Sequence, residues 1–254
     1  GYGKEAEKKV VEDEISSSET VPQTDISFGP KPFTIPDLSM AMVWVKPGTF
    51  EMGSPSGEKG RNNDETLHTV TLTDGYWLGK HEVTQSQWKG VMGNNPSRIK
   101  GPDRPVEQVS WNDVTSFCKK LTEQESKADR LPPGMSYQLP TEAQWEYACR
   151  AETKTAYAFG ESLTSAQANI VGGSSVSSTT NIGKYPANAW GFYDMHGNVE
   201  EWCADWYGDY PRGTARNPLG DAFGSSRVYR GGSWGLAGDA RSANRRRREP
   251  TDSF

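Results

Sequence analysis

Cysteine is the residue type in this chain with the widest chemistry, because a thiolate can act as a nucleophile or bind a soft metal. The chain has three cysteines, Cys118, Cys149 and Cys203, and none of them belongs to a Cys-x-x-Cys pair. An odd number at such wide spacing makes a poor disulfide framework and a poor zinc site. We therefore interpret all three as small, buried apolar residues.

Arginine is concentrated near the end of the sequence. Residues 227–254 contain seven arginines against Asp239, Glu249 and Asp252, which gives this segment a net charge of +4 in a chain whose total charge is -5. Two interpretations remain open: ordinary solvated surface, or a recognition patch for an acidic partner. Nucleic acid is not expected as a partner, because the whole domain is acidic and has no nucleic-acid-binding motif.

Three helix starts should position these residues within the domain. Each has a hydroxyl residue followed, three positions later, by a side chain that can bond back to the backbone, the pattern of a capping box. In the second, Asp replaces the usual Glu or Gln. The three boxes are Thr84 with Gln87, Ser110 with Asp113, and Thr141 with Gln144.

Short strands are predicted where apolar residues alternate with polar ones. This alternating pattern occurs at residues 42–45, 68–72, 76–78 and 227–230, and glycine-rich or serine-rich loops separate these segments. The pattern predicts an α+β domain with two main helices, short twisted sheets and much irregular structure. Residues 1–39 are predicted to form a flexible charged leader and a proline-containing linker. The folded domain is then expected over residues 40–254.

Six segments, in this order and spacing, resemble the formylglycine-generating enzymes, also called sulfatase-modifying factors. The resemblance implies a C-type-lectin-like fold, which the alternation of apolar residues alone does not identify. It covers about residues 40–250. The segments are residues 42–54, 68–88, 104–121, 137–152, 188–202 and 227–234.

The resemblance also implies a test for enzyme chemistry. The family's oxidase converts a substrate cysteine to formylglycine with copper held by two thiolates just after a Gly-Gly-Ser-Trp motif, and soft thiolates suit Cu(I). Here that motif ends at Trp234, and no cysteine follows it. We therefore expect no copper and no enzymatic activity. An active oxidase is the alternative.

Structural calcium is the second implication of the resemblance. The family binds calcium through a loop like residues 194–201, and carboxylate and carbonyl oxygens suit this hard cation. The matching ligands would be the side chains of Asp194 and Glu201 and the carbonyls of Gly197 and Val199. A second family site would begin at Asn169 and the Ile170 carbonyl, although its later acidic ligand falls on Ser174. The other interpretation is that these carboxylates only cap turns.

The C-terminal sequence resembles, in particular, the variable proteins of diversity-generating retroelements, in which the adenines of a template are mutagenised so that AAC or AAT asparagine codons change into others. Changing the adenines of an AAC or AAT codon can produce many of the residues found from position 235 onward. It cannot produce Trp or Glu, so Trp234 and Glu249 would be fixed positions. On this reading residues 227–254 form a diversified binding surface. Its candidate residues are Tyr229, Trp234, Gly235, Leu236, Gly238, Asp239, Arg245, Arg246, Arg247, Arg248, Asp252, Ser253 and Phe254. In the alternative reading Arg230 and Arg241 pair with core acids.

We therefore predict a non-enzymatic, receptor-type display protein that binds a protein or another surface ligand with acidic groups. A fixed pseudoenzyme that binds a protein partner is the remaining alternative. The expected location is extracellular or at the cell surface, as an outer-membrane lipoprotein whose only membrane contact is an N-terminal lipid anchor. The family resemblance favours a monomer, and its pattern continues to a further strand beyond Phe254.

Overall fold

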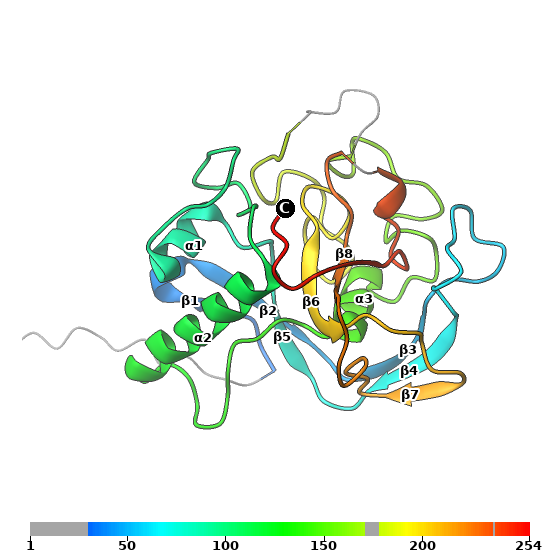
Figure 1. Cartoon of the computed structure of the whole chain (residues 1–254), viewed down its shortest axis with the longest axis horizontal. Coiled ribbons are helices and arrows are strands. Elements are labelled where there is room, and N and C mark those ends of the chain that lie inside the picture. Colours follow the sequence, from blue (N-terminus) through cyan, green and yellow to red (C-terminus); the bar gives the residue numbers. More distant parts are fainter. Residues whose placement is uncertain (1–29, 171–177, 236) are drawn as a thin grey trace, which may run out of the picture.

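The computed structural model describes residues 30–170, 178–235 and 237–254, which form an α+β domain (Figure 1). Residues 1–29 of the predicted leader and linker, Ser174 and Leu236 lie outside these ranges. The helices are α1 (Gln85–Met92), α2 (Trp111–Lys127) and α3 (Glu142–Arg150), with short 3-10 turns at Pro36–Leu38 and Ala237–Asp239. No helix of the described part is both long and apolar enough to cross a membrane.

Within the described residues, nine strands form three small sheets of three strands each. In the first, β2 (Met40–Val45) lies between β1 (Phe33–Ile35) and β5 (Tyr76–Gly79). In the second, β4 (His68–Leu72) lies between β3 (Gly48–Met52) and β7 (Thr214–Arg216). In the third, β8 (Arg227–Arg230) lies between β6 (Glu201–Trp206) and β9 (Arg246–Arg248). All pairings are antiparallel except that of β4 with β7.

All three predicted helix starts are confirmed as capping boxes. The side chains of Thr84, Ser110 and Thr141 each accept a hydrogen bond from the backbone N–H three residues later, and the return bonds are also present. The Asp at position 113 closes its box through Oδ2, which accepts from the Ser110 amide at 3.0 Å. A shorter acid therefore serves as well as Glu or Gln at this position.

Two apolar clusters form the core. The first surrounds α3, whose Trp145, Ala148 and Cys149 are fully buried against β3, β4 and β8. The second packs α1 and α2 over β1 and β2, where Trp88 stacks on Phe117 with ring centroids 5.2 Å apart. Figure 1 shows α2 beside the first sheet and α3 behind β6 and β8.

The predicted domain start at Met40 is wrong by one strand. Phe33–Ile35 forms β1, which pairs with β2 in antiparallel register from Phe33 opposite Met42 to Ile35 opposite Met40. Ile35 is fully buried in the second cluster. Its proline-rich surroundings indicated an extended linker, but an extended edge strand with one buried side chain fits the same local sequence.

Candidate binding surface

The C-terminal segment crosses the face of the third sheet (Figure 1). It leaves β8 through Gly231 and Gly232, both with positive φ values, +90° and +66°. A side chain at Gly232 would approach the Ala240 backbone nitrogen to 2.8 Å, so the tight turn requires glycine there. The chain then returns as β9, in which Arg246 pairs with Tyr229 of β8.

Residues 241–245 of this segment are buried and hold it to the core. Arg241 binds Glu65 through two bonds of 2.9 and 2.6 Å, and its Nη1 also contacts Glu58 at 2.5 Å. Arg245 binds both oxygens of Glu142, at 2.9 and 2.7 Å. Such forked pairs fix position as well as charge.

A second ionic cluster lies under β8. Arg230 is 1% exposed and contacts Glu146 on α3, with Glu142 at 3.5 Å. Glu146 also accepts from Arg150 at 2.9 Å. The alternative reading for Arg230 and Arg241 is thus confirmed: both pair with buried acids. These arginines are part of the scaffold.

Two candidate surface residues are wrong for the same reason. Arg245 is 3% exposed, and its guanidinium also lies 3.9 Å from the ring centroid of Tyr210. Tyr229 is 7% exposed and packs against Trp202 and Phe254 at 5.8 and 5.1 Å between ring centroids. Their side chains stabilise the domain and are not available to a ligand.

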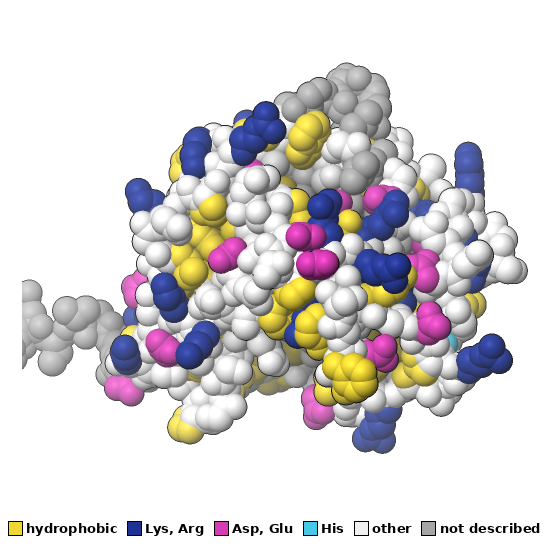
Figure 2. Space-filling view, in the orientation of Figure 1, with side chains coloured by type: hydrophobic (Ala, Val, Ile, Leu, Met, Phe, Trp, Pro, Cys, Tyr) yellow, Lys and Arg dark blue, Asp and Glu magenta, His cyan; other side chains and the backbone are white. Residues whose placement is uncertain are grey.

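The other candidates divide into exposed and half-buried side chains. Arg246 forms a two-bond pair with Asp239, at 3.0 and 2.6 Å, and Arg247 lies over the Tyr207 ring at 4.5 Å. Figure 2 shows basic and acidic side chains interspersed on this face. The exposed candidates are Gly235, Gly238, Arg246, Arg247, Asp252 and Ser253; the half-buried ones are Trp234, Asp239, Arg248 and Phe254.

The carboxyl end is held in place by backbone contacts. The carbonyl of Phe254 accepts from the Gln108 amide at 2.6 Å, and that of Pro250 accepts from the Asn112 amide at 3.2 Å. The Phe254 ring packs on Trp202 at 4.9 Å. The segment therefore presents its exposed side chains from a fixed backbone.

The three cysteines are free thiols, and two are fully buried. Burial raises the pKa of Cys149 to about 12, and Ser242 is its hydrogen-bond acceptor at 3.7 Å. Burial also lowers the pKa of the nearby His196 to about 4. Neutral, inaccessible groups of this kind are poor nucleophiles and poor bases at neutral pH.

The acidic loop at residues 194–201 contains buried carboxyl groups that lack cationic partners. Among the described residues, no Lys or Arg forms an ion pair with Asp194, Glu201 or the neighbouring Glu82. Burial raises the pKa of Asp194 to about 6 and that of Glu201 to about 7. No group of three or more His, Cys, Asp or Glu in the described ranges is arranged to hold a metal ion.

The second predicted calcium position has an unsatisfied oxygen. Asn169 is 1% exposed, and its amide nitrogen donates to the Ser178 carbonyl at 2.9 Å and to Asn198 Oδ1 at 3.1 Å. Its Oδ1 is buried and has no hydrogen-bond partner among the residues described. An oxygen left without a donor fits a cation ligand.

This fold and surface define a class: a C-type-lectin-like domain of the formylglycine-generating-enzyme type. The sulfatase-modifying factor enzyme 1-like domain matches residues 30–253, and the chain belongs to that family. Solved structures that share the fold include a Treponema and a Pseudomonas protein. Treponema denticola variable protein 1 gives a TM-score of 0.75 at 28% identity, with 88% of this chain and 95% of that chain covered. PvdO from Pseudomonas aeruginosa gives 0.77 at 28% identity, with 89% and 95% covered.

Relatives in sequence differ in the activity that their names describe. The chaperone protein LppX of Paenibacillus barcinonensis is 31% identical over 78% of this chain and 79% of its own length. The serine/threonine-protein kinase pkn1 of Chlamydia caviae is 33% identical over 84% of this chain, which spans 36% of the kinase. The formylglycine-generating enzyme of Streptomyces coelicolor is 31% identical over 63% of this chain and 50% of the enzyme. Family membership therefore does not assign one activity.

The sequence did not predict the acidic partners of Arg245. Glu142 is the first residue of α3 and is 3% exposed, although an acid at a helix start ordinarily faces solvent near the positive end of the helix dipole. One pattern in the sequence could have indicated that Arg241 and Arg245 are buried: they are four residues apart, and the three residues between them are small. This spacing distinguishes them from the exposed Arg246 and Arg247 that follow.

Proposed function

We propose that this protein is a non-enzymatic ligand-binding display protein whose exposed C-terminal side chains form the binding surface. One observation carries the proposal: residues 241–245 are all buried, whereas the neighbouring Arg246, Arg247, Asp252 and Ser253 are exposed. Arg, Asp and Ser, the residue types at these exposed positions, can all be encoded once the adenines of an Asn codon are mutated. Side chains that vary without contacting the core suit a diversified surface on a rigid backbone.

The chemistry of the surface favours a ligand with acidic groups. Arg246 and Arg247 are exposed, and a guanidinium forms forked hydrogen bonds to carboxylates or phosphates. Arg246 is bound to Asp239, so an incoming acid would compete with that pair. The half-buried rings of Trp234 and Phe254 supply apolar anchors beside the charged residues.

The absence of cysteine after Trp234 supports a role without catalysis. The sequence places its three cysteines at positions 118, 149 and 203, so the stretch that follows the Gly-Gly-Ser-Trp motif has no thiolate for copper. The resemblance to formylglycine-generating enzymes makes oxidase activity the alternative function. We expect no conversion of a cysteine-containing substrate peptide to formylglycine in the presence of copper, measured by mass spectrometry. Conversion would contradict the proposal.

Structural calcium is part of the proposal. Asp194 and Glu201, with the carbonyls of Gly197 and Val199, would form one site, and Asn169 and the Ile170 carbonyl would begin another. The support is the buried carboxyl groups without cationic partners and the unpaired Asn169 oxygen. A divalent cation would offset the lost hydration of these oxygens. Its role would be to stabilise the loops beneath the C-terminal segment.

An extracellular or cell-surface location with an N-terminal lipid anchor completes the proposal. A display protein needs its ligand outside the cell, and the charged composition of residues 1–25 suits a stalk.

The experiment that tests diversification is DNA sequencing around the gene. We expect a near-copy of the codons for residues 227–254 that differs mainly where the copy has adenine, with a reverse transcriptase gene nearby. Other diversified copies of the gene should encode different residues at positions 246, 247, 252 and 253 and the same residues at positions 241–245. Identical residues at all of these positions would instead indicate a fixed pseudoenzyme with a protein partner.

A further inference from the structure

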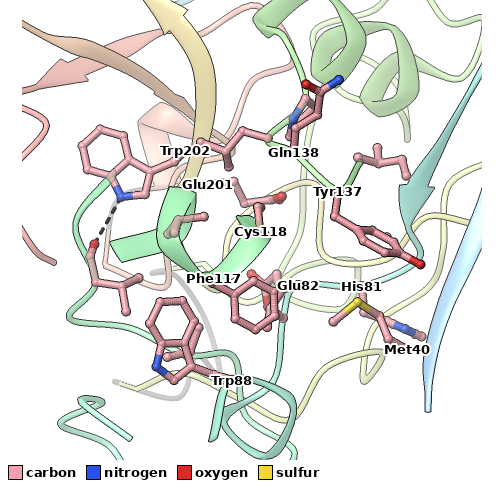
Figure 3. A pocket seen from close by; sticks show the side chains of 18 of the residues that line it. Met40, His81, Glu82, Trp88, Phe117, Cys118, Tyr137, Gln138, Glu201 and Trp202 are labelled. Carbon is pink, nitrogen blue, oxygen red and sulfur yellow. Dashed lines mark hydrogen bonds between the residues drawn. The ribbon is translucent and has the colours of Figure 1, made fainter. Parts of the chain in front are cut away.

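A cavity of about 200 Å³, partly open to solvent, lies between α2, the first sheet and the start of β6 (Figure 3). Helix α2 contributes Phe117 and Cys118 to its lining, β2 contributes Met40 and Met42, and β6 contributes Trp202. These residues come from separate parts of the chain, and most of the surface that they expose to the cavity is apolar. The cavity is separate from the exposed arginines of the C-terminal surface.

The cavity has a cause in the sequence of α2. Val114, Cys118 and Leu121 follow one another on the helix face that turns toward the first sheet, and all three line the cavity. Cysteine is the smallest of the three and stands between the other two. The opposite wall has Met40 and Met42, whose flexible thioether side chains adapt to irregular spaces and to different occupants.

Two polar groups on lining residues lack partners. The indole nitrogen of Trp88 and the hydroxyl of Tyr137 are buried and form no hydrogen bond with the described residues. Trp88 is 3% exposed. A buried donor without an acceptor is unfavourable. A ligand with an acceptor oxygen would therefore gain a hydrogen bond that no described residue supplies.

The lining of the cavity, which contains acidic side chains but no Lys or Arg, disfavours an anion. Glu82 and Glu201 both line it, and Figure 3 shows their side chains near Phe117 and Cys118. Glu82 is already bound to the Asn198 side chain at 2.6 Å and the Val199 amide at 3.0 Å. A carboxylate ligand would meet these acidic groups without a compensating cation among the lining residues other than His81.

We propose that this cavity binds a neutral small molecule: one aromatic ring, or an aliphatic group of similar size, with a short apolar substituent and one hydroxyl or carbonyl oxygen. The volume sets the size, because an apolar protein cavity of about 150 Å³ holds benzene and this one is about 200 Å³. The lining sets the apolar body. The unpartnered donors of Trp88 and Tyr137 call for an acceptor oxygen that reaches one of them.

Three related probes test the ligand class on the full-length protein. They are 4-ethylphenol, ethylbenzene, which lacks the oxygen, and 4-ethylbenzoate, which is an anion. We expect 4-ethylphenol to raise Tm and to bind roughly two- to tenfold more tightly than ethylbenzene, and 4-ethylbenzoate to leave Tm unchanged. No rise in Tm with either neutral probe, up to its solubility limit, would show that the cavity holds water or nothing and would overturn the proposal.

Matched variants locate the site. Cys118→Leu fills the cavity from α2 and should abolish the rise in Tm, whereas Ser116→Leu adds a leucine on the exposed face of the same helix and should preserve it. An unchanged rise in Cys118→Leu would place the probe elsewhere. Trp88→Phe combined with Tyr137→Phe should remove the preference for 4-ethylphenol over ethylbenzene, and a surviving preference would contradict the role of these donors.

A measurement on the unmodified protein covers the case in which a variant does not fold. Cys118 is the only partly exposed cysteine, since Cys149 and Cys203 are fully buried. Because Cys118 lines the cavity, 4-ethylphenol should slow its alkylation by a small neutral reagent at about pH 9, where most of the phenol, with a pKa of about 10, is still neutral. Equal alkylation rates with and without saturating probe would contradict binding at this site.

Discussion

Replacing Arg245 or Arg247 with Gln should separate the scaffold from the binding surface. Arg245 is buried, and Arg245→Gln removes both bonds to Glu142 together with the bond to the Gly208 carbonyl at 2.8 Å. Removing one partner of a buried ion pair costs about 3–5 kcal/mol. Glu142 keeps a 3.5 Å contact with Arg230, which favours the lower end of that range.

Arg247→Gln changes an exposed side chain of the same type two positions later. Exposed substitutions usually change the free energy of unfolding by less than about 0.5 kcal/mol. Loss of the Arg247 contact with the Tyr207 ring at 4.5 Å adds at most about 1 kcal/mol. The two variants should therefore differ by about 1.5 kcal/mol or more, although their sequence changes are chemically identical.

Urea unfolding followed by tryptophan fluorescence measures this difference, with equal denaturant dependence required in both variants. For a domain of this size, about 3 kcal/mol corresponds to a loss of roughly 6–12 °C in Tm. Equal losses in the two variants, or a larger loss in Arg247→Gln, would refute the division of the C-terminal segment into buried anchors and free surface residues.

Three further predictions concern pH, calcium and helix capping. Burial, with repulsion from Glu142, raises the pKa of Asp205 from 3.8 to about 7. Its contribution to stability is therefore full below about pH 4 and is lost as the pH rises through 7. Asp205→Asn should stabilise the protein at pH 8 by up to about 4 kcal/mol and flatten its stability between pH 4 and 7 in urea titrations, and a loss at pH 8 would contradict this. Millimolar calcium should raise Tm and a chelator should reverse the rise, whereas Asp194→Asn should reduce the calcium effect; an equal effect in the variant would exclude Asp194 as a ligand. Thr141→Ala should cost about 1 kcal/mol in urea unfolding, because Thr141 accepts from the Gln144 amide at the start of α3; no loss would mean that the remaining contacts of α3 compensate.

Local patterns in the sequence predicted local structure well. The capping boxes at Thr84, Ser110 and Thr141 each need only residues within one turn, so the three helix starts could be located from the sequence. The strand at 227–230 was predicted in the same way. The three-residue strands β7 and β9 were not, because so few residues show no alternation and their pairing with β4 and β8 is a tertiary contact.

The candidate surface was predicted only in part for a similar reason. Arg245 and Arg246 are adjacent and identical in type, yet the first is buried against Glu142 and the second is exposed and paired with Asp239. Nothing in an arginine run states which members face an acid from a distant helix. The cavity beside Cys118 also depends on the distance between α2 and the first sheet, which no single segment of sequence specifies.

The position of β9 at the edge of its sheet has a consequence for solubility. Among the described strands β9 pairs only with β8, so its outer backbone groups could template the addition of a strand from another molecule. Its three residues are all arginine, and their mutual repulsion opposes such edge-to-edge association. Diversified copies of the protein that carry neutral or aromatic residues at 246 and 247 would lose this protection. Those copies would aggregate, so the need for solubility would limit which binding surfaces can occur, whatever the ligand.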